Sequence, residues 1–130
     1  NNSQIISIFT KNLYEESPKS KYFSEIIITN DLSSRNELII DKSDVFIALP
    51  GGIGTLNEIF EVINKNLLNE IDKKIYLIND NFFWTPLEEL FKSLIRNKLL
   101  DQQKLKKNFK VCKLSELKTE FKKRYAKDTS

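Results

Sequence analysis

The chain has few of the residues on which several common kinds of active site depend: among 130 residues it has no His, no Met, one Cys and three Gly. Without His, nucleophile systems that pair Ser or Cys with His are excluded, and so is acid–base catalysis by imidazole. With Cys112 as the single thiol, the usual structural zinc sites and an internal disulfide are excluded as well. The sequence therefore predicts no metal site.

The absence of Met means that the initiator residue is also absent, so we expect the chain to be a fragment or a processed product. It shows no signal-peptide pattern and no apolar run long enough to cross a bilayer. Its lone Cys gives no sign of an oxidising compartment. We expect a cytoplasmic protein with no membrane partner. The length and a hydrophobic content of 40% suffice for one domain, residues 1–130, with its own core.

Positive charge is concentrated in residues 101–130, which hold 10 Lys and Arg against 4 Asp and Glu, whereas the whole chain has a net charge of +3. A basic segment of this kind is compatible with nucleic-acid binding. However, nine of the ten basic residues are Lys, the aromatic residues stand singly, and no nucleic-acid-binding motif is present. We favour the solvated face of a basic C-terminal helix over residues 115–126, and we disfavour a nucleic-acid partner.

Short apolar runs alternate with amphipathic segments, a rhythm typical of parallel β–α–β units. Strands are predicted at Gln4–Phe9, Glu25–Thr29, Val45–Leu49 and Ile75–Ile78, with a short edge strand at Lys110–Cys112. Helices are predicted between residues 31 and 44, after the glycine run to Asn69, from Thr85 through Ile95, and from Ser115 to Tyr125. The expected helix caps are Asp31 or Ser33, a capping box of Thr85 and Glu88, and Ser115. The predicted fold class is α/β: a Rossmann-like, three-layer αβα domain with a parallel sheet.

All three glycines lie in one run, Pro50-Gly51-Gly52-Ile53-Gly54-Thr55, between an apolar strand and an amphipathic helix. In open parallel sheets, ligands bind where the strands end. Glycines let main-chain N–H groups approach a phosphate closely, and the positive end of the following helix dipole adds to the attraction. The run therefore predicts a phosphate-binding turn made of Pro50, Gly51, Gly52, Gly54 and Thr55.

The glycine run is open to a second interpretation, a turn that is tight merely to pack the helix against the strand. Two better-known phosphate loops do not fit: a Walker loop needs Lys after its last Gly, and the dinucleotide fingerprint needs Gly at the position of Asn57. Thr55 and Glu58 also have the spacing of a capping box. Glu58 is therefore either a catalytic carboxylate or only part of a helix cap.

The segments Arg35-Asn36-Glu37 and Ser43 to Glu61 together resemble the LOG ("lonely guy") family, the cytokinin riboside 5′-monophosphate phosphoribohydrolases, some of which long carried the label lysine decarboxylase. Arg35 and Glu58 stand 23 residues apart, as in the family, and the PGGxGTxxE motif is intact. The resemblance continues more loosely to Leu100. It implies a Rossmann-like fold.

The chain departs from the family pattern at three places. Asn36 stands where the family has Lys, Leu32 stands where Met is expected, and Leu67-Leu68-Asn69 replaces a frequent Gln-Leu-Gly. The family's N-terminal part, with its own Gly-rich turn, has no counterpart here. We therefore expect a chain that is N-terminally truncated relative to the family, with part of the nucleotide pocket missing.

The resemblance implies hydrolysis of the N-glycosidic bond of a nucleoside 5′-monophosphate, AMP or an N6-substituted AMP, to free base and ribose 5-phosphate, without a metal or redox cofactor. It implies that Glu58 stabilises the oxocarbenium-like transition state or activates water, and that Arg35 orients the substrate or the leaving base. It further implies that the glycine turn holds the 5′-phosphate and that the protein is a homodimer. The alternative is a non-catalytic module of the same fold that binds a nucleotide or phosphate.

Four further residues have two interpretations each. Phe82, Phe83 and Trp84 either form a wall of the base pocket or pack in the core and the loop. Glu61 lies one helical turn beyond Glu58, and we favour a supporting or surface role for it.

Overall fold

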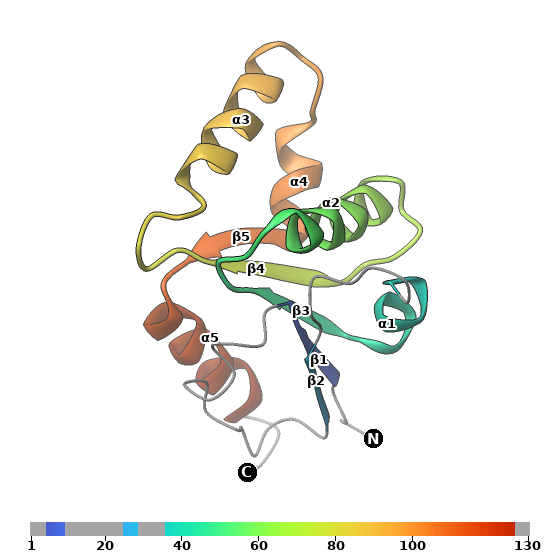
Figure 1. Cartoon of the computed structure of the whole chain (residues 1–130), viewed down its shortest axis with the longest axis vertical. Helices are drawn as coiled ribbons and strands as arrows, with labels where there is room; N and C mark the ends of the chain where they lie inside the picture. Colours follow the sequence, from blue (N-terminus) through green and yellow to red (C-terminus); the bar gives the residue numbers. More distant parts are fainter. Residues whose placement is uncertain (1–4, 10–24, 29–35, 127–130) are drawn as a thin grey trace.

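The computed structural model describes residues 5–9, 25–28 and 36–126, in which strands and helices alternate along the chain (Figure 1). The strands are β1 (Ile5–Ile8), β2 (Glu25–Ile28), β3 (Val45–Ala48), β4 (Lys74–Ile78) and β5 (Phe109–Cys112). The helices are α1 (Asn36–Lys42), α2 (Ile53–Leu67), α3 (Thr85–Arg96), α4 (Gln102–Asn108) and α5 (Leu114–Ala126). The predicted α/β class is confirmed, and each predicted strand is present with ends within one residue of the predicted ones.

The described strands form one sheet in the order β2-β1-β3-β4-β5, and every neighbouring pair is parallel. The direction in which the chain progresses across the sheet reverses between β1 and β3, because β1 pairs with β2 on one side and with β3 on the other. Because all strands are parallel, their carboxyl ends meet at one edge, and ligands bind at such an edge near the reversal. The predicted edge position of the last strand is confirmed.

Helices cover both faces of the sheet, so the molecule has three layers (Figure 1). One face packs against α1, α2, α3 and α4, and its buried core residues are Phe9, Ile40, Phe46, Ala48, Ile59, Val62, Ile63, Ile75, Leu77, Trp84, Phe91 and Leu105. The other face packs against α5, and its core residues are Ile6, Ile8, Val45, Ile47, Leu49, Tyr76, Ile78, Cys112, Leu117 and Phe121. In β3 and β4 successive residues alternate between these two cores, as they do in a parallel strand covered on both faces.

The basic C-terminal helix packs as an amphipathic helix. Leu117 and Phe121 of α5 are buried, and the ring of Phe121 meets that of Tyr76 edge to face with centroids 5.6 Å apart. Lys118, Lys122 and Lys123 are exposed to solvent. This is the solvated face that the sequence predicts. Among the described residues, no helix is long and apolar enough to cross a membrane.

The start of α3 is capped differently from the prediction. The capping box of Thr85 and Glu88 is wrong, because the cap position of α3 is Trp84 and no side chain at that position makes a cap hydrogen bond. Asn79 fixes this start instead: its Oδ1 accepts from Trp84 N–H at 2.6 Å, and its Nδ2 donates to Thr85 Oγ1 at 3.2 Å. The predicted caps of α1 at Asp31 or Ser33 lie outside the described residues.

The start of α5 is tied to the end of β4. The helix begins one residue before the predicted cap Ser115, at Leu114, whose N–H donates to Asp80 Oδ1 at 2.8 Å. Glu116 reaches back to accept from Lys113 N–H at 2.7 Å. The first turn of α5 is therefore held by acidic side chains, which the positive end of a helix dipole favours.

Helix α4 is an element that the sequence pattern did not predict. It is short and offers one buried apolar residue, Leu105, so it has no helical periodicity to detect. Its one local signal is Asp101, which accepts a hydrogen bond from Lys104 N–H at 3.1 Å as an N-cap.

The end of α2, the start of β4 and the end of α4 are joined by one asparagine. The Asn66 side chain donates to Lys73 C=O and accepts from Lys73 N–H, both at 2.9 Å, and Asn108 Nδ2 donates to Asn66 Oδ1 at 3.3 Å. Asn66 thus behaves towards Lys73 as a neighbouring main chain would. This contact fixes the C-terminal end of α2 against the sheet.

Candidate functional site

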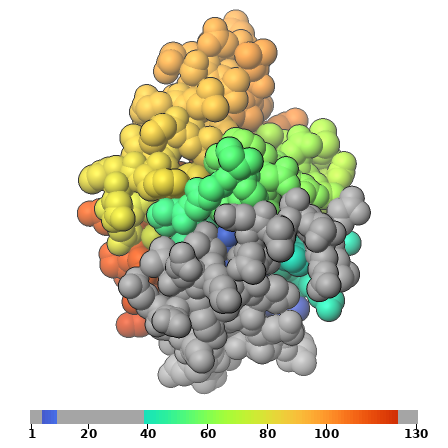
Figure 2. Space-filling view, viewed as in Figure 1, coloured from blue at the N-terminus to red at the C-terminus, as the bar shows by residue number. Residues whose placement is uncertain are grey.

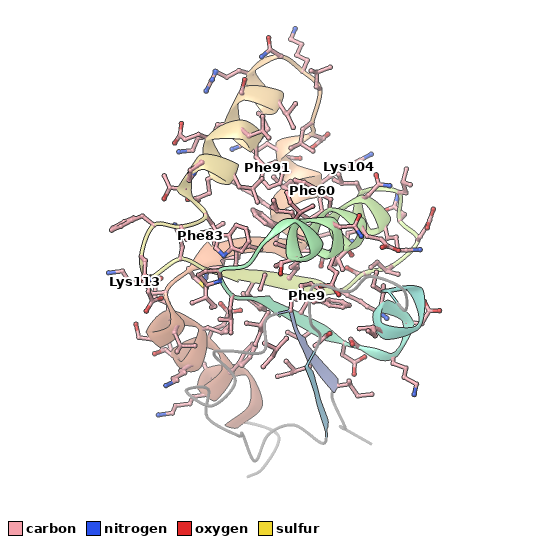
Figure 3. The ribbon with its side chains drawn as sticks, in the orientation of Figure 1. Phe9, Phe60, Phe83, Phe91, Lys104 and Lys113 are labelled. Atoms are coloured by element: carbon pink, nitrogen blue, oxygen red, sulfur yellow. The ribbon has the colours of Figure 1, made fainter. Side chains whose placement is uncertain are left out.

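The carboxyl ends of β1, β3 and β4 meet at the start of α2. In the paired register of β3 and β4, Ala48 lies opposite Leu77, so the turn after β3 and the loop after β4 leave the sheet side by side. Phe9, just after β1, donates its N–H to Ile47 C=O at 3.0 Å. The Phe9 C=O accepts a buried hydrogen bond from Thr55 Oγ1 at 3.1 Å. Figure 3 shows the Phe9 side chain beneath α2, on the face of the sheet that this helix covers.

The glycine turn does not need glycine for its backbone angles. None of the three glycines has a positive φ; Gly52 is extended, with φ −96° and ψ −155°. Gly52 is also exposed, so no neighbouring atoms exclude a side chain from this position. The interpretation as a turn made tight for packing therefore has no support at Gly52. The property that remains is the absence of a side chain at the surface, which leaves room for a ligand to approach the backbone.

The first turn of α2 presents main-chain N–H groups to this open surface. The N-cap is Gly52, and the first hydrogen bond runs from Leu56 N–H to Gly52 C=O at 3.1 Å. The N–H groups of Ile53 and Gly54 therefore have no acceptor within the helix. The first turn contains no acidic residue, and Ile53 is 81% exposed, so the helix start lies at the surface (Figure 2, green). These features suit an anion.

The capping-box interpretation of Thr55 and Glu58 is wrong. Because α2 begins at Ile53 after the cap Gly52, Thr55 is the third helical residue and Glu58 lies in the second turn. The Thr55 hydroxyl donates to Phe9, on another strand, so it ties the helix to β1. A role for Thr55 in holding a phosphate would accordingly fall to its main chain.

Glu58 lies on the buried face of α2 with a relative exposure of 1%. The buried residues of the helix are Thr55, Glu58, Ile59, Val62 and Ile63. Their spacing is that of the stripe by which a helix packs on a core, where apolar residues are usual. An ionisable carboxyl group at such a position is unfavourable for stability unless it is compensated. A buried carboxyl group in the second turn of this helix is therefore a candidate functional residue.

The aromatic residues after β4 divide into one core residue and two exposed ones. Trp84 is 2% exposed and belongs to the core under α2 and α3, which supports the packing interpretation for this residue. Phe82 is 72% and Phe83 46% exposed, and the Phe83 ring meets the Trp84 ring edge to face at 4.8 Å. Phe82 has a positive φ of 61°, an unfavourable angle for an aromatic residue. Both exposed rings lie at the carboxyl edge of the sheet, beside the glycine turn.

Arg35 lies outside the described residues, immediately before α1. The C-terminal end of α1 is held at the start of β4, where Lys73 Nζ donates to the C=O groups of Ile40 at 2.6 Å and Asp41 at 3.0 Å.

Two other chemistries receive no support. Burial raises the pKa of the Cys112 thiol to about 11, so the reactive thiolate is scarce at neutral pH. Within residues 5–9, 25–28 and 36–126, no group of three or more His, Cys, Asp or Glu side chains is arranged to hold a metal ion.

Comparison with known proteins shows the family to which the chain belongs. The family model described as "Possible lysine decarboxylase" matches residues 1–120. The chain belongs to this family. Its relatives within the possible lysine decarboxylase family include a cytokinin riboside 5′-monophosphate phosphoribohydrolase of Rhodococcoides fascians, 41% identical over 64 residues, which are 49% of this chain and 32% of that protein.

Two further relatives carry the same kind of name. A probable cytokinin riboside 5′-monophosphate phosphoribohydrolase of Oryza sativa subsp. japonica is 33% identical over 87 residues, 67% of this chain and 39% of the relative. The cytokinin riboside 5′-monophosphate phosphoribohydrolase of Mycobacterium tuberculosis is 40% identical over 55 residues, 42% of this chain and 29% of the relative. The chain thus aligns with between 29% and 39% of the length of these relatives.

The hydrogen bond between Thr55 and Phe9 should contribute measurably to stability. Replacing Thr55 with Val keeps the shape but leaves the buried Phe9 carbonyl unpaired, which should lower the free energy of unfolding by about 1–2 kcal/mol in urea denaturation. The matched control is Thr119→Val, whose exposed hydroxyl donates to Ser115 C=O at 3.0 Å and whose loss should change stability by less than about 0.5 kcal/mol. Equal effects of the two substitutions on the free energy of unfolding would contradict a stabilising role for the hydrogen bond between Thr55 and Phe9.

Proposed function

We propose that this chain carries the phosphate-binding and catalytic part of an enzyme that hydrolyses the N-glycosidic bond of a nucleoside 5′-monophosphate. The observation that carries the proposal is Glu58, a carboxyl group buried on the core face of α2 directly behind the glycine turn. The names of the relatives, which are phosphoribohydrolases of cytokinin riboside 5′-monophosphates, support the same reaction. AMP and N6-substituted AMP are the substrates that we propose.

The 5′-phosphate binds at the turn from Pro50 to Thr55. Gly51, Gly52 and Gly54 let it approach the main chain, and the N–H groups at the start of α2 donate to its oxygens. The helix dipole and the absence of acidic residues from the first turn favour the negative charge. Binding at this place fixes the ribose near the second turn of α2, where Glu58 lies.

Glu58 acts on the anomeric carbon of the ribose. Cleavage of an N-glycosidic bond passes through an oxocarbenium-like transition state, whose positive charge a carboxylate stabilises, and the same carboxylate can orient the attacking water. Arg35, 23 residues before Glu58 in the sequence, orients the substrate or the departing base through its planar guanidinium group. Phe82 and Phe83 offer apolar surface for the base at the same edge of the sheet.

The role of the glycine turn is tested by Gly52→Ala. Because Gly52 is exposed and has a negative φ, Ala should leave the unfolding free energy within about 1 kcal/mol of the wild type. The added methyl group occupies the space that a phosphate needs, so the affinity for ribose 5-phosphate, measured by isothermal titration calorimetry, should fall at least about tenfold. Asn57→Ala, an exposed change one turn away, is the matched control and should bind as the wild type does. If Gly52→Ala binds ribose 5-phosphate with unchanged affinity, the phosphate does not bind at this turn.

The role of Glu58 is tested by Glu58→Gln. This change removes the charge that stabilises the transition state, so release of free base from AMP or N6-isopentenyl-AMP, followed by chromatography, should fall by about a hundredfold or more. The affinity for ribose 5-phosphate should change little. Glu61→Gln, on the same helix and half-buried, is the control and should retain most activity.

The outcomes of this assay separate the two functions that the sequence allows. Equal activity of Glu58→Gln and the wild type would reduce Glu58 to a structural residue. A wild-type protein that releases no base from either nucleotide, yet binds ribose 5-phosphate in a manner that depends on Gly52, would be the non-catalytic binding module.

We also propose that the protein forms a homodimer. Ile53 and Phe60 lie seven residues apart on one face of α2 and are 81% and 41% exposed. Exposed apolar side chains grouped in this way are typical of an interface between subunits. Sedimentation equilibrium at micromolar concentration should give twice the mass of the chain, and a monomer there would contradict the proposal.

A further inference from the structure

A groove of about 400 Å³ lies at the β5 edge of the sheet, away from the glycine turn and Glu58. Its apolar lining comes from three elements: Phe91 and Ile95 of α3, Leu105 of α4, and Phe109 and Val111 of β5. In Figure 1, α3 and α4 stand over the β5 edge, and in Figure 2 the same part of the chain projects from the rest of the molecule. Figure 3 shows Phe91 on the side of α3 that faces α4.

The main chain of β5 offers hydrogen-bonding groups at this groove. In a strand, the N–H and C=O groups of successive residues point alternately to the two sides. The C=O of Cys112 faces β4, because it accepts from Asn79 N–H at 2.8 Å. The main-chain N–H and C=O of Lys110 therefore also face β4, whereas those of Phe109 and Val111 point to the open edge.

Three of these outward groups have no partner within the described part of the chain. The Phe109 N–H donates to Leu105 C=O at the end of α4, which accounts for one outward group. The Phe109 C=O and both the N–H and the C=O of Val111 remain, and β5 pairs with no strand other than β4 there. The residues that present these groups are also the β5 residues whose apolar side chains line the groove. Such an edge is a template for an added strand.

The charge at the groove is mainly positive. Its lining includes Lys92, Lys106 and Lys110 against the single acidic residue Glu88. Lys110 already donates to Glu120 at 3.1 Å. Lys92 meets Glu89 at 3.3 Å, but both side chains are more than 60% exposed, where an ion pair contributes little.

The positive charge decides between two occupants. Lys106 has no ion-pair partner among the residues that the structure describes. A second copy of the chain paired edge to edge would bring two sets of these lysines together, which is unfavourable. An acidic strand would bring opposite charges together.

We propose that the β5 edge binds an extended acidic peptide segment of another protein as an added strand. Its main chain exchanges hydrogen bonds with Phe109 C=O and with the N–H and C=O of Val111. Alternate side chains of the added strand face α3 and α4. Among these, apolar side chains enter the groove and acidic ones lie near Lys106 and Lys92. This is strand addition, in which the main chain supplies affinity and the groove supplies specificity.

The first test uses a fluorescein-labelled nine-residue peptide, Glu-Ser-Val-Ser-Val-Ser-Val-Ser-Glu, in which glutamate and valine share one face of the strand and serine occupies the other. Fluorescence anisotropy should show saturable binding, and the Val111 amide should exchange its hydrogen more slowly when the peptide is bound, because it becomes a hydrogen-bond donor. The same peptide with lysine in place of glutamate should bind at least about tenfold more weakly. No binding, equal binding of the two peptides, or an unchanged exchange rate at Val111 would each overturn the proposal.

Two variants test the charge and the hydrogen bond separately. Lys106→Glu should weaken binding of the glutamate peptide about tenfold or more, whereas Lys118→Glu, an exposed change on α5, should leave it unchanged. Val111→Pro removes the donor and should also weaken binding; proline is tolerated on edge strands, and circular dichroism checks the fold. If Val111→Pro does not fold, the two lysine variants still decide. Self-association that Val111→Pro abolishes would show that a second copy is the occupant and would overturn the proposal.

Discussion

The packing of α2 on β3 and β4 is the constraint on which the rest of the structure depends. Ile59, Val62 and Ile63 fill the core on one face of the sheet, and the same face of the helix carries Thr55 and Glu58. Because this stripe fixes the rotation of the helix, it also fixes where the carboxyl group of Glu58 lies. The Thr55 bond to Phe9 at one end of α2 and the Asn66 contacts at the other hold its position along the sheet. Helix α2 therefore belongs both to the core and to the candidate site.

Much of the fold followed from patterns in the sequence, and the parts that did not follow have physical reasons. Fully apolar runs such as Val45–Leu49 are recognisable because a strand covered on both faces has no polar side. Helix α4 escaped prediction because Leu105 is its single buried apolar residue and one residue defines no period. The capping box at Thr85 failed because the competing partner, Asn79, comes from the loop after β4, and local spacing does not reveal such a contact.

The sequence predicts the position of the candidate site but not its details. The three glycines and the following helix placed it at the carboxyl edge, but the burial of Glu58 depends on how α2 is rotated against the sheet. The glycines themselves do not adopt the positive φ angle for which glycine is usually needed. Positive φ angles of 61° occur at Asn69, Phe82 and Lys98, while every glycine has a negative φ. Asn69 is well suited to this angle, because Asn tolerates positive φ better than most residues other than glycine.

The buried position of Trp84 has one more consequence. It is the single tryptophan of the chain, it is 2% exposed, and it lies between the end of β4 and the start of α3. Its indole is surrounded by the core that α2 and α3 share, and its main-chain N–H is bonded to Asn79. The tryptophan fluorescence of the protein therefore arises from one known environment beside the carboxyl edge of the sheet. A spectral shift on unfolding reports the opening of this part of the core, without an added label.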